Sequence, residues 1–179
     1  MRYITGHDGA SEDLVALFTD TFIASEGAAE GAAIGGLVRN MLATTPGDDL
    51  LVCSARDDDT TLGCIIFSRL VFDDDPRVAF ILAPLAVRTS HQRKGIGQAL
   101  LRFGLDEMRG RGVDVAFTYG DPAYYGKVGF EPITEETARA PLALSMPQGW
   151  LAQSLRENPF TPFKGPSRCV VALDSPDYW

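Results

Sequence analysis

The chain has 179 residues, about the size of one ordinary domain. With 45% hydrophobic and 22% charged residues its composition is globular, which excludes disordered, collagen-like and disulfide-scaffold classes. The net charge of −8 argues against a surface that neutralises nucleic-acid phosphates. The sequence offers no apolar run near the ~20 residues of a membrane span and no signal-peptide pattern at its start. We therefore expect a cytoplasmic protein that binds neither nucleic acid nor membrane.

The first quarter of the chain predicts a short strand at 1–5 and two helices. Ser11 is followed by acidic residues, and this pattern predicts a capped helix because the Ser side chain accepts from the free amides of the first turn. The stretch 28–42 has apolar residues at helical spacing. Pro46 and Gly47 end this helical region.

The middle of the chain predicts an antiparallel meander followed by a crossover. Short runs rich in Val, Ile, Leu and Phe are separated by acidic turns, which favours antiparallel strands. The apolar residues then adopt helical spacing over 95–109, and a further strand follows. A strand, a helix and a strand in this order form a crossover with parallel strands. The expected strands are 50–55, 62–72, 78–87 and 113–119.

The last third predicts fewer elements, with one clear strand at 169–173 and a short helix at 150–155. The fold class expected for the whole chain is α/β (α+β), a mixed, mostly antiparallel sheet with helices on both faces. We expect a single domain, 1–179. The large aromatic residues of the last third are expected to pack on the sheet rather than line a pocket, and they are Trp150, Phe160, Phe163 and Trp179.

Two groups of residues are assigned structural roles. Cys53, Cys64 and Cys169 lack the spacing of a zinc or redox motif, so we interpret them as core thiols and expect no metal site. The acidic runs 57–59 and 73–75 are interpreted as solvated turns.

The most informative segment begins where the strand 78–87 ends. A basic loop follows, and Gly95-x-Gly97 opens a helix, so that free backbone amides and the positive end of the helix dipole meet there. Glycines let a phosphate approach the backbone, while Arg88, Arg93 and Lys94 supply positive charge. The alternative is a helix that uses Gly merely as a permissive cap. The sequence lacks the Gly-Lys-Ser/Thr of a P-loop, and Leu100 stands where a Rossmann fingerprint needs a small residue.

Pro84 interrupts an otherwise continuous apolar strand. Proline cannot donate to a ladder, yet a strand that feeds a crossover should be central, so we expect a bulge there. The bulge would splay this strand from its parallel neighbour at or after Pro84. The backbone of Leu85, Ala86 and Val87 would then be free to pair with an amide-bearing ligand. The alternative is an edge strand with an inert proline.

These residues resemble a known family. The segment 92–97, Gln-Arg-Lys-Gly-Ile-Gly, is similar to the Q/R-x-x-G-x-G/A pyrophosphate loop of the GCN5-related N-acetyltransferases (GNAT), and 85–87 occupies the place of their bulged strand. The segment 123–130 is similar to their Y-x-x-x-G-F motif, and its Gly-Asp-Pro-x-Tyr-Tyr context resembles the bacterial YhbS-like branch. The resemblance covers roughly 78–130 and leaves 131–179 as a variable carboxyl-terminal segment.

The resemblance implies acetyl-CoA as cosubstrate. It implies that Leu85, Ala86 and Val87 form the strand that offers main-chain groups to the pantetheine arm, and that Tyr125 is the general acid. Tyr125 could instead be a packing residue, and Tyr124 could substitute for it. Ser90 and the pair Gly120-Asp121 depart from common family residues, which leaves the acceptor side open. The residues implied to cradle the pyrophosphate are Gln92, Arg93, Lys94, Gly95, Ile96, Gly97 and Gln98.

The implied activity is transfer of an acetyl group from acetyl-CoA to an amino group of a small molecule or a protein. The alternatives are a non-catalytic acyl-CoA-binding module and a transferase that uses another acyl-CoA. The sequence names no general base, for which Asp121, His91 and a water chain are the candidates. A homodimer is left open.

Overall fold

The computed structural model describes residues 1–156 and 161–179, which include four α-helices and eight strands. The strand order is β1-β2-β3-β4-β5-β7-β6, and β8 pairs with β3. Because β4 and β5 are parallel within a mostly antiparallel sheet, the predicted fold class is confirmed. The helices are α1 (Ser11–Glu26), α2 (Ala28–Thr44), α3 (Ile96–Gly110) and α4 (Pro122–Tyr125). The strands are β1 (Arg2–Thr5), β2 (Leu50–Asp57), β3 (Thr60–Phe72), β4 (Ala79–Val87), β5 (Val115–Tyr119), β6 (Glu131–Pro132), β7 (Trp150–Ser154) and β8 (Ser167–Arg168).

The chain forms two compact units. The first contains Met1–Phe67 and Pro84–Gly104, and the second contains Ser68–Ala83 and Leu105–Trp179. Strands β3 and β4 and helix α3 each contribute residues to both units. Within the described residues, no helix combines the length and the apolar character that crossing a membrane requires, and no cluster of three or more His, Cys, Asp or Glu side chains could hold a metal ion.

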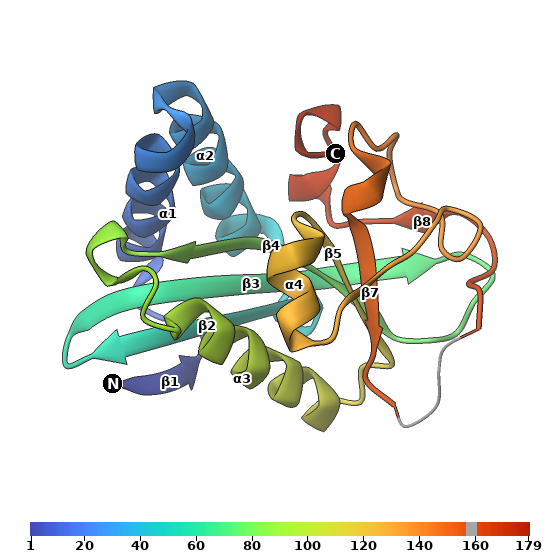
Figure 1. Ribbon diagram of the computed structural model, residues 1–179, viewed down its shortest axis with the longest axis horizontal. Helices are drawn as coiled ribbons and strands as arrows, with labels where there is room; N and C mark the ends of the chain where they lie inside the picture. Colours follow the sequence, from blue (N-terminus) through green and yellow to red (C-terminus); the bar gives the residue numbers. More distant parts are fainter. Residues whose placement is uncertain (157–160) are drawn as a thin grey trace. The chain divides into compact units, whose positions relative to one another are not determined.

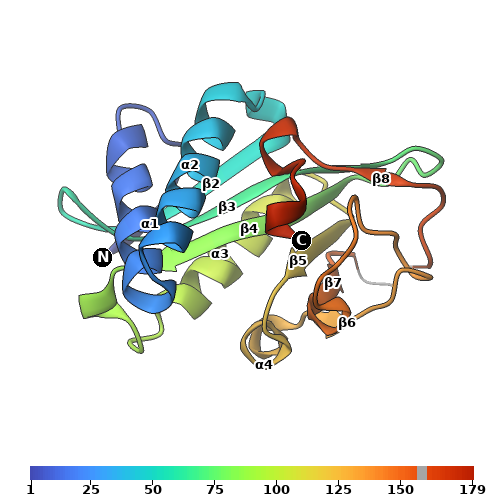
Figure 2. The same ribbon diagram turned by 90° about the horizontal axis from the view of Figure 1, so that it is seen from above.

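In the first unit, α1 and α2 lie side by side, as Figure 1 and Figure 2 show. Gly31 makes this close packing possible, because a Cβ at this position would overlap with Ile23 of α1. The start of α1 differs from the prediction in one detail. Ser11 is the first helical residue rather than the cap, since Ala10 holds the cap position and no side chain bonds the free amides there. The apolar faces of the two helices are buried, and they contain Leu14, Leu17, Phe18, Leu37, Val38 and Met41.

In the second unit, β3, β5 and β7 carry an aromatic core, to which β3 contributes Phe72. Phe117 of β5 stacks on Trp150 of β7 with ring centroids 5.1 Å apart and meets the edge of Phe163 at 5.4 Å. The Trp150 indole donates to the Ala138 carbonyl oxygen at 2.8 Å, so its polar atom is satisfied. Trp150, Phe163 and Trp179 are buried, which confirms their predicted packing role. Phe160 lies outside the described residues.

The last third contains two errors of the sequence-based prediction. The residues predicted as a helix at 150–155 form β7, because each of Trp150 to Ser154 pairs with a residue of β5. The strand predicted at 169–173 is also wrong. Pairing with β3 involves Ser167 and Arg168, and Val171–Leu173 then forms a 3₁₀ turn whose Leu173 carbonyl accepts from Trp179. Pairing with strands distant in sequence decides the secondary structure of both segments, because neither has a strong hydrophobic periodicity of its own.

The cysteine prediction holds for two of the three residues. Cys53 and Cys64 are fully buried, and burial raises the pKa of the Cys64 thiol to about 12, as expected for an inert core thiol. Cys169 is only partly buried and is not a core residue.

The acidic turn at 73–75 is not simply solvated. The Asp75 side chain is 6% exposed and receives two hydrogen bonds from Arg77, from Nε at 2.8 Å and from Nη2 at 2.7 Å. The Arg77 guanidinium lies 3.7 Å from the centroid of the Phe163 ring and donates to the carbonyl oxygens of Thr161 and Pro162. Hydrogen bonds from Arg77 lower the pKa of Asp75 from 3.8 to about 2. This ion pair therefore anchors the carboxyl-terminal segment to the turn before β4.

We expect Asp75→Asn to lower the free energy of unfolding at pH 7 by about 1–3 kcal/mol, the contribution of hydrogen bonds to a charged partner. The ionised carboxylate is favoured in the folded state, so its stabilisation is present above the unfolded pKa of 3.8 and is lost as the pH falls toward 2. Urea unfolding of both proteins at pH 7 and pH 2 measures the effect, which should nearly vanish at pH 2. Asp48→Asn, at an exposed position, is the control. An equal difference at both pH values would contradict the assignment.

Candidate functional site

The connection between β4 and α3 is anchored to the start of β3 within the first unit. The Arg88 backbone amide donates to the Leu62 carbonyl oxygen at 2.8 Å, and Arg88 Nε donates to that of Thr61 at 2.6 Å. Arg88 is therefore occupied in holding the loop, although the sequence suggested that it supplies charge to a phosphate. Lys94 Nζ donates to the Ser90 carbonyl oxygen at 3.1 Å, which closes the loop on itself.

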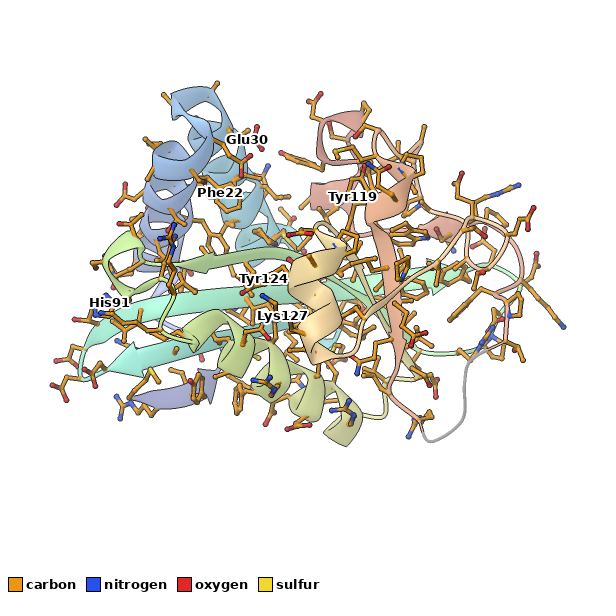
Figure 3. All side chains as sticks on the ribbon, in the orientation of Figure 1. Phe22, Glu30, His91, Tyr119, Tyr124 and Lys127 are labelled. Atoms are coloured by element: carbon orange, nitrogen blue, oxygen red, sulfur yellow. The ribbon has the colours of Figure 1, made fainter. Side chains whose placement is uncertain are left out.

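His91 belongs to this loop, as expected for a loop residue, and Figure 3 shows it there. Its Nδ1 lies 2.9 Å from the Ser90 hydroxyl, which is exposed. This local contact does not by itself give His91 the role of a base.

The start of α3 presents free backbone amides. The Ala99 amide donates to the Gly95 carbonyl oxygen at 3.0 Å and closes the first turn, and the amides of Ile96 and Gly97 ahead of it have no acceptor within the helix. Gly95 has φ +81° and Arg93 φ +60°, and the backbone turns sharply at both residues to enter the helix. The left-handed conformation explains why glycine occupies position 95. The helix that the sequence predicted after the basic loop is thus present, and anion binding at its start stays a prediction.

The pairing of β4 with β3 determines which backbone groups of β4 point away from β3. The Arg88 amide bonds to Leu62, and backbone groups alternate direction along a strand, so those of Leu85 and Val87 point away from β3. The Val87 carbonyl oxygen accepts a hydrogen bond from Gln92 Nε2 at 3.1 Å. The Gln92 side chain thus faces the strand, and its functional group is not aimed at the helix N-terminus.

The pairing of β4 with β5 ends earlier than predicted. The parallel register runs from Ala79–Val115 to Leu82–Thr118, two residues before Pro84, and β4 lies between β3 and β5 rather than at an edge. The Thr118 hydroxyl donates to the Leu82 carbonyl oxygen at 3.2 Å, and the Gly120 amide donates to the Gly149 carbonyl oxygen at 2.9 Å. These two bonds satisfy groups that would otherwise extend the ladder.

The segment after β5 in the second unit is a short helix with defined ends. The Asp121 carboxylate accepts from the Ala123 amide at 2.8 Å as the cap of α4, followed by Pro122 in the first turn. Asp121, a candidate base in the sequence, is thus used as a cap. Gly129 ends the segment with φ +97°, and the side chain of Gln153 lies against it. Figure 3 shows Tyr124 and Lys127 leaving this segment on the same side.

Tyr125 is held by close packing. A Cβ at Gly120 would come within 2.7 Å of the Tyr125 ring, which explains the glycine at a position where the sequence departs from the common family residue. The ring also meets Phe130 edge to face at 5.9 Å. Burial raises the pKa of Tyr125 to about 12, against a smaller lowering by the Thr118 hydroxyl. Tyr125 is therefore protonated at neutral pH and has a fixed ring.

The chain resembles known proteins in sequence and in fold. The acetyltransferase (GNAT) family matches residues 12–130. The chain belongs to the GNAT acetyltransferase family. It is 33% identical to the uncharacterised N-acetyltransferase YjhQ of Escherichia coli K-12 over 139 residues, which are 75% of this chain and 76% of YjhQ. This relationship confirms the family that segments 85–97 and 123–130 predicted.

Two solved structures share the GNAT fold with this chain. The crystal structure of E. coli YhbS in complex with CoA has a TM-score of 0.79 at 22% identity, covering 97% of this chain and 92% of YhbS. A Brucella melitensis GNAT acetyltransferase in complex with acetyl-CoA has a TM-score of 0.69 at 22% identity and covers 97% of each chain. The chain is also 32% identical to E. coli YhbS over 75 residues, 42% of this chain and 45% of YhbS, so it is similar to YhbS in sequence as well as in fold.

The predicted residues fall into two groups. The first unit brings together 85–87 and 92–98, and the second unit places Tyr125 beside Tyr124 with the rings edge to face at 5.2 Å. Thr118 carries no signal in the sequence, because a threonine within a strand is ordinary. The bond from the Gln92 side chain to Val87 has no sequence signal either, since a long polar residue in a loop gives no indication of its direction.

Helix α3 lies unusually close to β3, and this closeness positions its N-terminus. A Cβ at Gly104 would come within 2.5 Å of the Phe67 ring. We expect Gly104→Ala to destabilise the protein by about 1–3 kcal/mol through overpacking, although alanine is the better helix former. Thermal unfolding measures this effect. Gly110→Ala in the same helix meets nothing within 4 Å and should leave stability unchanged or slightly raised. Equal effects of the two variants would show that close packing is not the reason for Gly104.

Proposed function

We propose that residues 1–179 form one N-acetyltransferase domain that moves an acetyl group from acetyl-CoA to an amino group of a small molecule or a protein. The observation that carries this proposal is the start of α3. There the first backbone amides of the helix, at Ile96 and Gly97, follow a left-handed Gly95, next to a strand end whose Leu85 and Val87 groups point away from β3. Family membership supplies the acyl-CoA chemistry.

The loop suits a pyrophosphate by charge and by shape. The helix N-terminus offers amides and a positive partial charge, and Arg93 and Lys94 are exposed cations beside it. A pantetheine arm carries amides that can pair with the strand residues Leu85 and Val87 as an added strand would. We therefore assign pyrophosphate binding to residues 93–98 and pantetheine binding to 85–87. Gln92 is left out of the pyrophosphate site, because its side chain bonds to the Val87 carbonyl oxygen.

The chemistry is direct transfer. The amine nitrogen attacks the thioester carbonyl, a tetrahedral intermediate forms, and the C–S bond breaks to release CoA as a thiolate, which takes up a proton as the amide product loses one. A neutral amine is needed for attack, and water or a group of the acceptor itself can take the proton. We name no carboxylate for this step, because Asp121 is already used as a helix cap.

We assign Tyr125 the role of hydrogen-bond donor to the sulfur of the leaving CoA thiolate. A thiol has a pKa of ~8.5, so complete transfer of a proton from a phenol of pKa about 12 to the thiolate is uphill. Hydrogen-bond donation to the sulfur as its negative charge develops fits this phenol better than full proton transfer. Its fixed ring supports such a role because the donor is already oriented.

We expect CoA and acetyl-CoA to stabilise the protein, by ~2.7 kcal/mol at a hundredfold excess over Kd. Gly97→Glu should abolish this stabilisation, because it adds a side chain and a negative charge where the pyrophosphate would lie. The melting temperature with and without ligand measures the effect. The double variant Arg93→Glu/Lys94→Glu alters only exposed side chains and tests the same site if Gly97→Glu does not fold.

Gly47→Glu is the control for this experiment, since it lies in a turn where a Cβ meets nothing within 4 Å. It should retain the full ligand effect. A full acetyl-CoA shift in both loop variants would show that the phosphate loop is elsewhere.

We expect Tyr125→Phe to lower turnover about 10²- to 10³-fold, the usual effect of removing one donor to a developing negative charge. The substitution keeps the ring, so CoA affinity and melting temperature should change little. Thiol release from acetyl-CoA with a panel of amines measures the rate. Because the pKa of Tyr125 is about 12, the wild-type rate should show no loss from this group below about pH 11.

Tyr124→Phe is the matched control, because the neighbouring residue on a helix points about 100° away. Equal turnover in Tyr125→Phe and the wild type, where chemistry limits the rate, would remove Tyr125 from the mechanism. CoA binding without thiol release for any amine would instead favour a non-catalytic acyl-CoA-binding module.

A further inference from the structure

The Val87 carbonyl oxygen already has a partner inside the chain. It points away from β3, and Gln92 Nε2 donates to it at 3.1 Å. The donor is a primary amide, which presents the same N–H group as the secondary amides of a pantetheine arm. The Val87 carbonyl oxygen thus already accepts from an amide N–H, the same chemical group that the pantetheine arm would offer it.

The loop geometry brings Gln92 back to the strand. Between the two residues the chain makes a 3₁₀ turn, Thr89–His91, which the Arg88 bonds to Thr61 and Leu62 hold in place. Gln92 then has an extended backbone, with φ −65° and ψ 161°. Its side chain is long enough to reach back five residues, whereas Asn would be one methylene short. The contact depends on this anchored turn and on an amide at position 92.

We propose that the Gln92 side chain acts as an internal substitute for the pantetheine amide at Val87, and that it thereby sets the affinity for CoA. The proposal rests on the proposed function, because it takes 85–87 as the pantetheine strand. When CoA binds, the Gln92 amide leaves the Val87 carbonyl and a pantetheine N–H replaces it. Gln92 therefore competes with CoA for the Val87 carbonyl oxygen, although the rest of the loop that begins at Gln92 binds CoA.

The expected effect is moderate. The bond is partly exposed, and a single hydrogen bond of this kind changes a binding constant by about 3- to 10-fold. Without Gln92 the carbonyl is bonded to water in the free protein, which a ligand displaces at lower cost. The effect must be confined to ligands that carry the pantetheine arm, because the adenine nucleotide half of CoA makes no use of Val87.

The test compares two ligands and two proteins by calorimetry. Gln92→Met keeps the length of the side chain and removes its donor. We expect it to bind CoA about 3- to 10-fold more tightly than the wild type and to bind 3′-phospho-ADP, the nucleotide half of CoA, with unchanged affinity. Gln148→Met, at an exposed position of the second unit, is the matched control and should change neither affinity.

A spectroscopic measurement tests the displacement itself. The side-chain NH₂ signal of Gln92, identified by its loss in Gln92→Met, should shift when CoA is added and stay unchanged with 3′-phospho-ADP. Unchanged or weaker CoA binding by Gln92→Met, with wild-type nucleotide binding, would overturn the proposal. Parallel weakening for both ligands would also overturn it and would assign Gln92 to the pyrophosphate. A wild-type protein that binds neither ligand would instead reject the proposed function, and the substitute role with it.

Discussion

The requirement that every backbone amide and carbonyl has a hydrogen-bond partner determines the candidate site. Strand β4 pairs with β5 in register over Ala79 to Leu82 and continues to Val87. Near the end of this register, side chains replace neighbouring backbone as the hydrogen-bond partners of β4. The Thr118 hydroxyl donates to the Leu82 carbonyl oxygen, and the Gln92 side-chain amide donates to the Val87 carbonyl oxygen. A strand whose outward groups are satisfied by side chains can exchange those partners for a ligand, because a side chain moves without unfolding the sheet.

The same requirement for hydrogen-bond partners also gives the start of helix α3, which follows this strand, its expected affinity for anions. The first amides of α3 have no acceptor one turn earlier, so a helix start that stays accessible favours an anion. Its position depends on packing in the middle of the helix, where Gly104 lets α3 lie against Phe67 of β3. The close contact at Gly104 and the helix start are therefore properties of the same helix, and the proposed phosphate site would already be formed before a ligand binds.

The sequence predicted best where local chemistry determines structure. The meander and the crossover helix follow from periodicity and glycine positions, and the structure confirms them, while the phosphate loop stays a prediction. It predicted least well in the last third. Segment 150–155 forms β7 because β5 offers it a ladder, and Cys169 to Leu173 leaves the sheet because only Ser167 and Arg168 meet β3. Asp75 was interpreted as a turn residue, because nothing in the sequence places Phe163 and Arg77 beside it.

By itself, the sequence determined the family, the mixed sheet with its parallel pair and the residues that could meet a pyrophosphate, because these depend on short motifs and on the repeat of apolar residues. Only the tertiary structure decided how those residues are used. It placed the Gln92 amide on Val87, committed Arg88 to the backbone of β3 and fixed the Tyr125 ring against Gly120 with a raised pKa. The physical reason is that direction, burial and hydrogen-bond partnership arise between residues distant in sequence, and no local pattern encodes them.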